Sequence, residues 1–214
     1  MKYSLPFFLL LFLLPSLGAQ SLTDAQRAAI DSIISPDVPA GGPGMAVGVL
    51  RDGEPIYVRY AGLADVKQEI PIGPASRFNI ASLAKQFTAF AILELVEQGK
   101  ISLADDVRQY LPELYPDIKD PITMADLLNH TSGIRGFTNL WSLQGITWWK
   151  AKLGNDDVLV TLSQQTALNH PPGTQRMYTN SNYVLLTHIV ARVTGQSFKT
   201  YTDAMFQRLN MPHT

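Results

Sequence analysis

Two residues three positions apart, Ser82 and Lys85, have the types and spacing that nucleophilic attack on a carbonyl requires. A serine hydroxyl becomes a useful nucleophile when a neighbouring base accepts its proton. Residues three apart share one face of a helix, so the Lys85 amine can reach the Ser82 hydroxyl. A desolvated lysine close to positive potential can act as that base. Free N–H groups at a helix start, including that of Ser82, would also stabilise a developing oxyanion. The pair therefore predicts acyl transfer.

The alternative interpretation is that Ser82 caps a helix and Lys85 is an ordinary surface residue. The pattern of the following residues argues against it. Apolar side chains occur on more than one side of the helix, at Leu83, Phe87, Phe90, Ala91 and Leu95. A helix of this kind is central in a fold, so we expect Lys85 not to point freely into solvent.

Tyr178 and Asn180 form a second group, after the turn-forming segment 171–174 and before a predicted helix. A tyrosine beside an ammonium group loses its proton more easily and can then transfer protons. An asparagine side chain offers a donor and an acceptor, which suits a substrate amide. The alternative is that Tyr178 packs in the core and Asn180 caps the helix.

Secondary-structure patterns place these residues on a short β-rich segment followed by a long helical one. Asp24 is expected to cap a first helix, and runs 45–50 and 55–62 around Asp52-Gly53 predict a hairpin. Extended residues 77–80 lead into a helix over 82–98, with Gly99 as its C-terminal cap. Further helices are expected at 103–110, 123–129, 156–165, 181–194 and 198–209. A lone hairpin is marginally stable, so we expect an incomplete sheet whose remaining strands lie beyond Thr214.

Composition narrows the classes of protein that the chain could be. Lys2, an apolar run over residues 5–14 and small residues up to Ala19 predict a signal peptide over 1–19 and export to the periplasm or medium. The run is too short for a stable membrane span. A net charge of −1 without a basic run argues against a nucleic-acid partner. The chain has no Cys and no metal-ligand spacing of His, so we expect no metal and no cofactor.

Two remaining groups of residues receive structural interpretations. His130 lies in an Asn-His-Thr-Ser-Gly turn, where hydrogen bonding is favoured over catalysis. Trp141, Trp148 and Trp149 fall in a stretch expected to be irregular after Gly136. They either line an apolar acyl pocket or anchor a long loop to the core.

Three motifs occur in the order found in the β-lactamase-related serine hydrolases, and the chain resembles that family. They are Ser-Leu-Ala-Lys at 82–85, Leu-Leu-Asn-His-Thr-Ser-Gly-Ile at 127–134 and Tyr-Thr-Asn-Ser-Asn-Tyr-Val-Leu-Leu at 178–186. The family includes class C β-lactamases, D-alanyl-D-alanine carboxypeptidases and related esterases. The resemblance implies that Ser82 is acylated, that Lys85 and Tyr178 share the proton transfers, and that Asn180 contacts the substrate's amide side chain.

The sequence departs from the family pattern in two places. The family's third motif, Lys or His followed by x-Gly on a later strand, does not occur in these 214 residues, and that strand supplies the second oxyanion N–H. Half an oxyanion hole catalyses poorly, so the chain by itself is expected to be inactive. Thr179 stands where the family often has Ser or Ala, which puts little in doubt.

The resemblance implies an α+β fold of the β-lactamase/transpeptidase type, an antiparallel α/β sandwich with a helical domain. We expect residues 20–80 to form the N-terminal part of the sheet domain and 81–214 a mostly helical domain that carries the motifs. The predicted function is an exported serine hydrolase acting on a peptide, β-lactam or ester. The alternative is a non-catalytic protein that binds a peptidoglycan-like ligand. The oligomeric state does not follow from the sequence.

Overall fold

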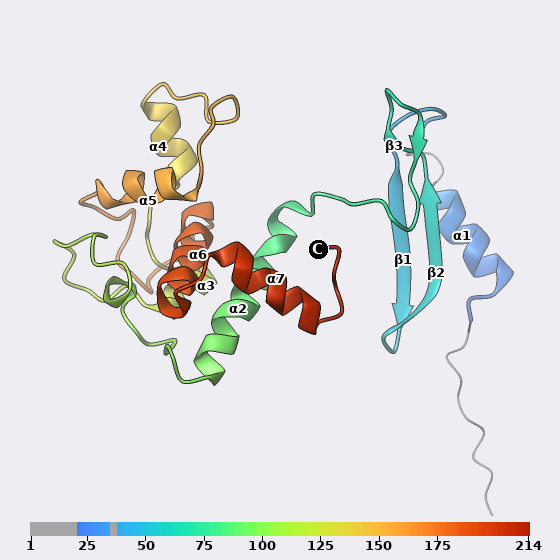
Figure 1. The fold of residues 1–214 in the computed structure, drawn as a ribbon. Helices are drawn as coiled ribbons and strands as arrows, with labels where there is room; N and C mark the ends of the chain where they lie inside the picture. The colour runs from blue at the N-terminus through green and yellow to red at the C-terminus, as the bar shows by residue number, and fades with distance from the viewer. Residues whose placement is uncertain (1–20, 35–37) are drawn as a thin grey trace, which may run out of the picture. The chain divides into compact units, whose positions relative to one another are not determined.

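The computed structural model describes residues 21–34 and 38–214, and its contacts divide the chain after Asn79 into two units (Figure 1). We describe each unit by itself. The predicted signal peptide, residues 1–19, lies outside the described residues. Within the described ranges, no helix has the length and apolar character needed to cross a bilayer.

The first unit is a helix and two short antiparallel sheets. It contains α1 (Asp24–Ile34), β1 (Met45–Arg51), β2 (Glu54–Ala61), β3 (Leu63–Asp65) and β4 (Ile70–Pro71). The predicted hairpin is confirmed as the antiparallel pair β1–β2. Asp52 and Gly53 at its turn have φ of 53° and 84°, the left-handed conformation that a two-residue hairpin turn requires. The pair β3–β4 was not predicted, because two or three residues are too few to show an alternating pattern.

Polar contacts join α1 to one face of the hairpin. Asp31 accepts hydrogen bonds from the hydroxyl of Tyr57, at 2.5 Å, and from the guanidinium of Arg59. Tyr57 and Arg59 are two residues apart and therefore share a face of β2. The opposite face carries the exposed apolar side chains of Leu50, Val58 and Tyr60. The sheet is thus incomplete, as the hairpin alone predicted.

The start of α1 corrects one prediction. Asp24 is the first helical residue, and Thr23 caps the helix instead. The Thr23 hydroxyl accepts the Gln26 N–H at 3.3 Å, while the Gln26 side chain accepts the Thr23 N–H at 2.9 Å. This reciprocal arrangement satisfies two N–H groups, whereas Asp24 would satisfy one.

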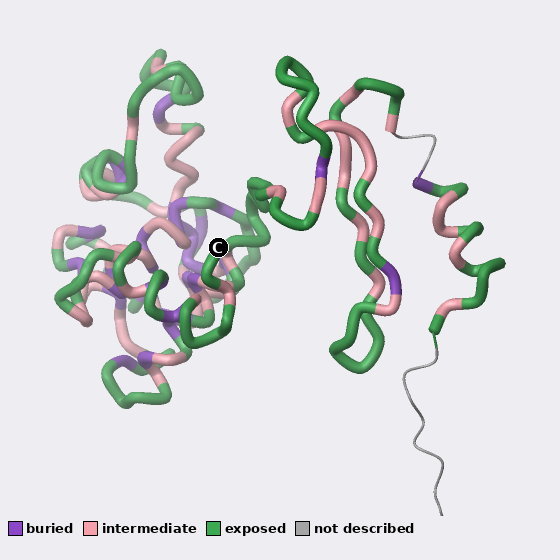
Figure 2. Tube along the Cα trace, turned by 45° about the vertical axis from the view of Figure 1, so that its right-hand side comes forward, coloured by how far each residue is buried: buried purple, intermediate pink, exposed green. Residues whose placement is uncertain are grey.

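The second unit is a cluster of helices packed around α6. Its elements are η2 (Ala81–Ala84), α2 (Lys85–Glu97), η3 (Val107–Gln109), α3 (Met124–Asn129), α4 (Phe137–Leu143), α5 (Asn155–Ser163), α6 (Asn180–Thr194) and α7 (Phe198–Arg208). Helix α6 contacts α2, α3, α5 and α7. Figure 2 shows most of the buried chain gathered in this unit.

The contact between α2 and α6 fixes the position of both sequence motifs. Ile92 and Leu95 of α2 and Leu185 and Ile189 of α6 are fully buried. Burial of side chains of this size contributes roughly 1.5–3 kcal/mol each. Gly99, with φ of 67°, ends α2 as predicted, and the Lys100 N–H reaches back to the Leu95 carbonyl at 3.0 Å.

The helix predicted over 103–110 is wrong. Only Val107–Gln109 form a single 3₁₀ turn. The surrounding backbone pairs with a distant segment instead: Val107 N–H donates to the Ile122 carbonyl at 2.8 Å, and Met124 N–H to the Asp105 carbonyl at 3.0 Å. Asp106 also accepts the Arg108 N–H, which is the local bond that draws aspartate out of helices.

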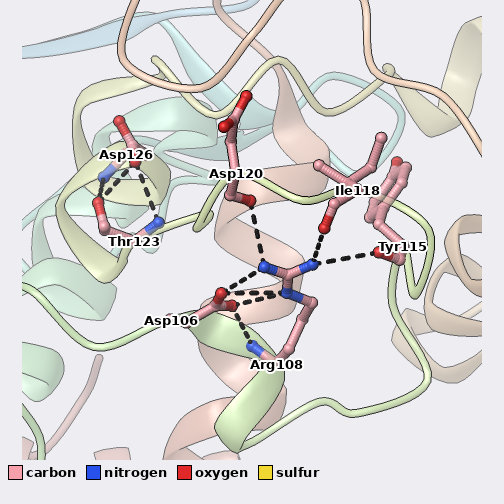
Figure 3. A network of polar contacts seen from close by, with 7 residues as sticks. All are labelled: Asp106, Arg108, Tyr115, Ile118, Asp120, Thr123 and Asp126. Atoms are coloured by element: carbon pink, nitrogen blue, oxygen red, sulfur yellow. Dashed lines mark hydrogen bonds and ion pairs between the residues drawn. The ribbon is translucent and has the colours of Figure 1, made fainter.

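One guanidinium holds the irregular segment 105–123 in place. Arg108 pairs with Asp106 and donates to the carbonyls of Tyr115, Ile118 and Asp120 (Figure 3). Beside it, Thr123 and Asp126 form a capping box that starts α3. The segment has few regular backbone hydrogen bonds, so Arg108 replaces them and fixes the start of α3.

Helix α4 falls in the stretch that was expected to be irregular. Thr138, Asn139 and the aromatic residues have low helix propensity, which hides the helix in the sequence. Tertiary contacts stabilise it: Phe137 N–H donates to the Ser181 hydroxyl at 2.9 Å, and the Trp141 indole donates to the Thr161 hydroxyl at 2.7 Å. Trp141 therefore anchors this segment to the core, as one of the two interpretations had it.

A close backbone contact follows α3. Gly133 has φ of 72°, and a methyl group on its Cα would lie 2.1 Å from the His170 carbonyl oxygen. Asn169 N–H donates to the Gly133 carbonyl at 2.7 Å. Glycine is therefore required here for both conformation and space.

We expect Gly133→Ala to lower the free energy of unfolding by about 3 kcal/mol or more, because positive φ and a steric clash add together. Gly145→Ala is the matched control, since Gly145 has φ of 76° with no neighbouring atom within 4 Å. Gly145→Ala should lower the free energy of unfolding by about 1 kcal/mol, because only the positive φ opposes it. Urea unfolding followed by circular dichroism measures both. Equal losses would show that the contact with His170 does not constrain the fold.

Candidate active site

Ser82 and Lys85 lie at the entrance to α2 with their side chains in contact. The Lys85 ammonium donates to the Ser82 hydroxyl oxygen at 3.1 Å. Ser82 lies in the 3₁₀ turn η2 and Lys85 is the first residue of α2. Ser82 is exposed and Lys85 is partly buried. The predicted contact between the two side chains is confirmed, although Ser82 precedes the α-helix that was expected to begin there.

Tyr178 and Asn180 reach the same place from the start of α6. The hydroxyls of Tyr178 and Ser82 are 2.8 Å apart and hydrogen-bonded. The Asn180 carbonyl oxygen accepts from the Lys85 ammonium at 2.7 Å and from the Tyr178 hydroxyl at 3.1 Å. The structure therefore brings all four predicted site residues together, although residues 82 and 178 are far apart in sequence.

Both capping alternatives for these residues are wrong. Ser82 makes no capping hydrogen bond, since its hydroxyl contacts Lys85 and Tyr178. Tyr178 is 49% exposed rather than buried in the core. Thr179, not Asn180, caps α6 by accepting the Ser181 N–H at 3.2 Å. The side chains of Tyr178 and Asn180 are thus available to the site.

The residue before Ser82 has a strained backbone. Ala81 has φ of 46°, a left-handed conformation that costs a residue with a Cβ about 1–2 kcal/mol. Such conformations persist where the surrounding structure imposes them, and they are concentrated at functional sites. Here the strain lies at the first residue of η2, directly before Ser82.

Three polar residues after Asn180 hold the start of α6 against α3 and the turn that follows it. Buried Asn182 accepts from the Ser132 hydroxyl at 2.8 Å and donates to the Leu127 carbonyl at 3.3 Å. The Ser181 hydroxyl donates to the Arg135 carbonyl at 2.7 Å, and the Tyr183 hydroxyl donates to the Leu128 carbonyl at 3.2 Å. Sequence reasoning assigned no role to these residues. Successive polar residues at the start of an otherwise apolar helix were the signal that could have revealed them.

His130 lies behind Tyr178 and is 6% exposed. Its ring centroid is 4.5 Å from that of Tyr178 and 5.2 Å from that of Tyr183. Its carbonyl accepts the Met177 N–H at 2.8 Å, and its Nδ1 accepts the Thr179 N–H at 3.4 Å. These hydrogen bonds fit the structural interpretation of the turn.

The charge of Lys85 affects the proton affinity of its neighbours. Hydrogen bonds from Lys85 and Ser82 and the ammonium charge lower the pKa of Tyr178, against the opposing effect of burial. Burial and the charges of Arg176 and Lys85 lower the pKa of His130, while a backbone contact with Thr179 partly offsets them. The site therefore favours an ionisable phenol beside a neutral imidazole.

A cavity of about 240 Å³ opens beside these residues, between α2 and α6. Its lining residues are Ala81, Ala84, Lys85, Thr88, Asn180, Tyr183, Val184 and Thr187. Lys85 and Asn180 thus form part of its wall. The tryptophans proposed as pocket residues are not among those that line it. Trp148 and Trp149 are exposed and pack edge to face with each other.

Known proteins resemble this chain in both sequence and fold. The sequence profile of the family described as Beta-lactamase matches residues 30–214. Protein flp of Staphylococcus aureus (strain MRSA252) is 33% identical over 198 residues, which cover 90% of this chain and 39% of flp. The chain thus spans well under half the length of this relative.

Solved structures show the same fold. The octameric penicillin-binding protein homologue from Pyrococcus abyssi is 26% identical with a TM-score of 0.76, over 88% of this chain and 44% of its own. The D-amino acid amidase from Ochrobactrum anthropi SV3 is 26% identical with a TM-score of 0.70, over 88% of this chain and 52% of its own. The predicted α+β fold of the β-lactamase/transpeptidase type is confirmed.

Replacing Lys85 by Met should raise the pKa of Tyr178 toward that of an ordinary tyrosine, because the hydrogen bond and positive charge that favour the phenolate are lost. Tyrosine ultraviolet difference titration measures this pKa, with Tyr178→Phe identifying the signal. Lys100→Met, an exposed lysine just beyond α2, is the control and should leave the titration unchanged. An unchanged Tyr178 titration in Lys85→Met would contradict the electrostatic account.

Proposed function

The chain belongs to the β-lactamase family, and we propose that it forms part of a serine hydrolase that is acylated on Ser82. The observation that carries the proposal is the shared hydrogen bonding of the Ser82 hydroxyl with Lys85 and Tyr178. A serine hydroxyl so placed can pass its proton to the phenolate of Tyr178, which the Lys85 ammonium favours, or to Lys85 in its neutral form.

The proposed reaction proceeds in two steps. In the first, the Ser82 oxygen attacks the substrate carbonyl, and its proton passes to Tyr178 or Lys85. The tetrahedral intermediate then collapses: the bond to the leaving nitrogen or oxygen breaks, and that atom takes up the proton. In the second step, a water molecule gives a proton to Tyr178 or Lys85 as its oxygen attacks the acyl carbon. The bond between that carbon and the Ser82 oxygen then breaks, the serine takes up the proton, and the carboxylic acid product leaves. The Ser82 N–H stabilises the oxyanion in both steps.

Substrates with an amide next to the reacting carbonyl fit the proposed role of Asn180. Its side chain lies at the cavity wall and already accepts from Lys85 and Tyr178, so its NH₂ group is left to donate to a substrate carbonyl. Peptides, β-lactams and esters are the proposed substrate class. The names of the penicillin-binding homologue and the amidase support this range.

A non-catalytic binding protein is the second candidate. Only one N–H for an oxyanion is proposed within these 214 residues, and loss of one such donor reduces turnover about 10²–10³-fold. A protein that kept the cavity but lacked the other donor would bind a peptidoglycan-like ligand without hydrolysing it. We also propose export of the protein, on the basis of the apolar run over residues 5–14.

A fluorophosphonate probe should label the full-length protein at Ser82, because the hydroxyl is exposed and hydrogen-bonded to its base. Ser82→Ala should abolish labelling, and Lys85→Met should slow it by about 10²–10⁴-fold. Ser142→Ala, which changes an exposed serine of α4, is the control and should label like the wild type. Equal labelling of Ser82→Ala would show that the nucleophile is another residue.

Assays of the 214-residue chain test whether turnover needs the second oxyanion donor, which is expected on a later strand. We expect negligible hydrolysis of nitrocefin and of a p-nitrophenyl ester, since one oxyanion donor remains. Steady-state absorbance assays measure both reactions, with Ser82→Ala as the background. Robust hydrolysis that depends on Ser82 would contradict the proposal that a Lys/His-x-Gly strand is essential.

A further inference from the structure

We propose that His130 is a positioning residue for Tyr178, and that protonation of its imidazole displaces the phenol from Ser82. This inference rests on the proposed function only in giving Tyr178 a part in proton transfer. The contacts that carry it are independent of any reaction.

His130 holds Tyr178 from both sides of that residue in the sequence. The His130 carbonyl accepts the Met177 N–H at 2.8 Å, and its Nδ1 accepts the Thr179 N–H at 3.4 Å. The adjacent Thr131 carbonyl accepts the Gly173 N–H at 2.9 Å, which extends the pairing along the loop. The backbone of the loop that presents the phenol is therefore attached to the turn at 130–131.

The imidazole also contacts the phenol ring itself. The rings of His130 and Tyr178 are tilted by 42° with centroids 4.5 Å apart, and the ring of Tyr183 lies 5.2 Å from His130. The Lys85 ammonium lies 5.0 Å and 5.6 Å from the ring centroids of Tyr178 and Tyr183. Two aromatic rings thus connect the imidazole to the ammonium that contacts Ser82.

A neutral imidazole suits this position. The Thr179 N–H is a donor, so Nδ1 must carry a lone pair and the single ring proton lies on Nε2. A second proton would turn Nδ1 into a donor facing another donor, and the hydrogen bond would be lost.

The surrounding charges act against that second proton. The facing groups are the cations Arg176 and Lys85 and the phenols of Tyr178 and Tyr183. The nearest acid on α3, Asp126, is occupied by hydrogen bonds from Thr123 and Thr131. No carboxylate among these groups is left to stabilise an imidazolium, so its formation should move the loop.

The test uses the 214-residue chain with ¹³C labels on tyrosine Cζ and histidine Cε1, followed by NMR from acid to alkaline pH. Tyr178→Phe identifies the tyrosine signal. We expect the Tyr178 signal to show two inflections: an alkaline one from its own phenol, and an acidic one at the pH where His130 takes up a proton. His130→Asn should abolish the acidic inflection and keep the alkaline one, since Asn tolerates the left-handed backbone at φ of 61° and offers an acceptor oxygen.

His188→Asn is the matched control, because His188 lies on α6 and contacts the Asn155 carbonyl. It should leave both inflections unchanged. A Tyr178 signal that stays constant while His130 titrates would overturn the proposal, and the wild type alone decides this point. An acidic inflection that persists in His130→Asn would also overturn it.

Labelling of Ser82 by the fluorophosphonate probe keeps this inference separate from the proposed function. Coupled titrations without labelling of Ser82 in the full-length protein would leave the positioning role in place and remove the hydrolase function. Labelling of Ser82 without coupled titrations would support the hydrolase function and overturn the positioning role of His130. If both hold, the labelling rate of His130→Asn should lose the acid-side decline that follows His130 protonation in the wild type.

Discussion

The candidate site depends on one ammonium group shared between two helices. Lys85 lies at the start of α2 and donates both to Ser82 on its own side and to Asn180 at the start of α6. A hydrogen bond from Lys85, together with its charge, also lowers the pKa of Tyr178. Hydrogen bonds to a charged donor are stronger than neutral ones, so the contact also fixes the two helix starts relative to each other. Replacing Lys85 would therefore remove the hydrogen bonds, the positive charge and the contact that fixes the two helix starts.

Packing behind the site gives this arrangement its rigidity. Helices α2 and α6 contact each other, and both contribute fully buried side chains to one hydrophobic core: Ile92, Leu95, Leu185 and Ile189. Buried Asn182 also joins α6 to α3 and the turn after it. The side-chain oxygen and the NH₂ group of Asn182 both form hydrogen bonds away from solvent. Buried hydrogen bonds of this kind are costly to break. Helices α2, α3 and α6 therefore supply the site from one packed core.

Several features of the fold and of the site could be predicted because their causes are local in sequence. The spacing of Ser82 and Lys85 on one helical turn and the Asp52-Gly53 hairpin turn are of this kind. The failures arose where distant contacts decide the structure. The expected helix over 103–110 was replaced by pairing with residues 122–124, and α4 formed through bonds of Phe137 and Trp141 to α6 and α5. The bonds of Ser181 and Asn182 were likewise beyond reach, since their partners lie 46 and 55 residues away.

The central claim is that Ser82 activation depends on Lys85 and Tyr178 acting as one unit. A double-mutant cycle on the rate of Ser82 acylation in the full-length protein, with Lys85→Met, Tyr178→Phe and the double variant, measures their coupling directly. Residues that act as a unit show strongly non-additive losses, so the double variant should lose about as much as the slower single variant. Losses that multiply would show that the two side chains act independently, and would contradict the account.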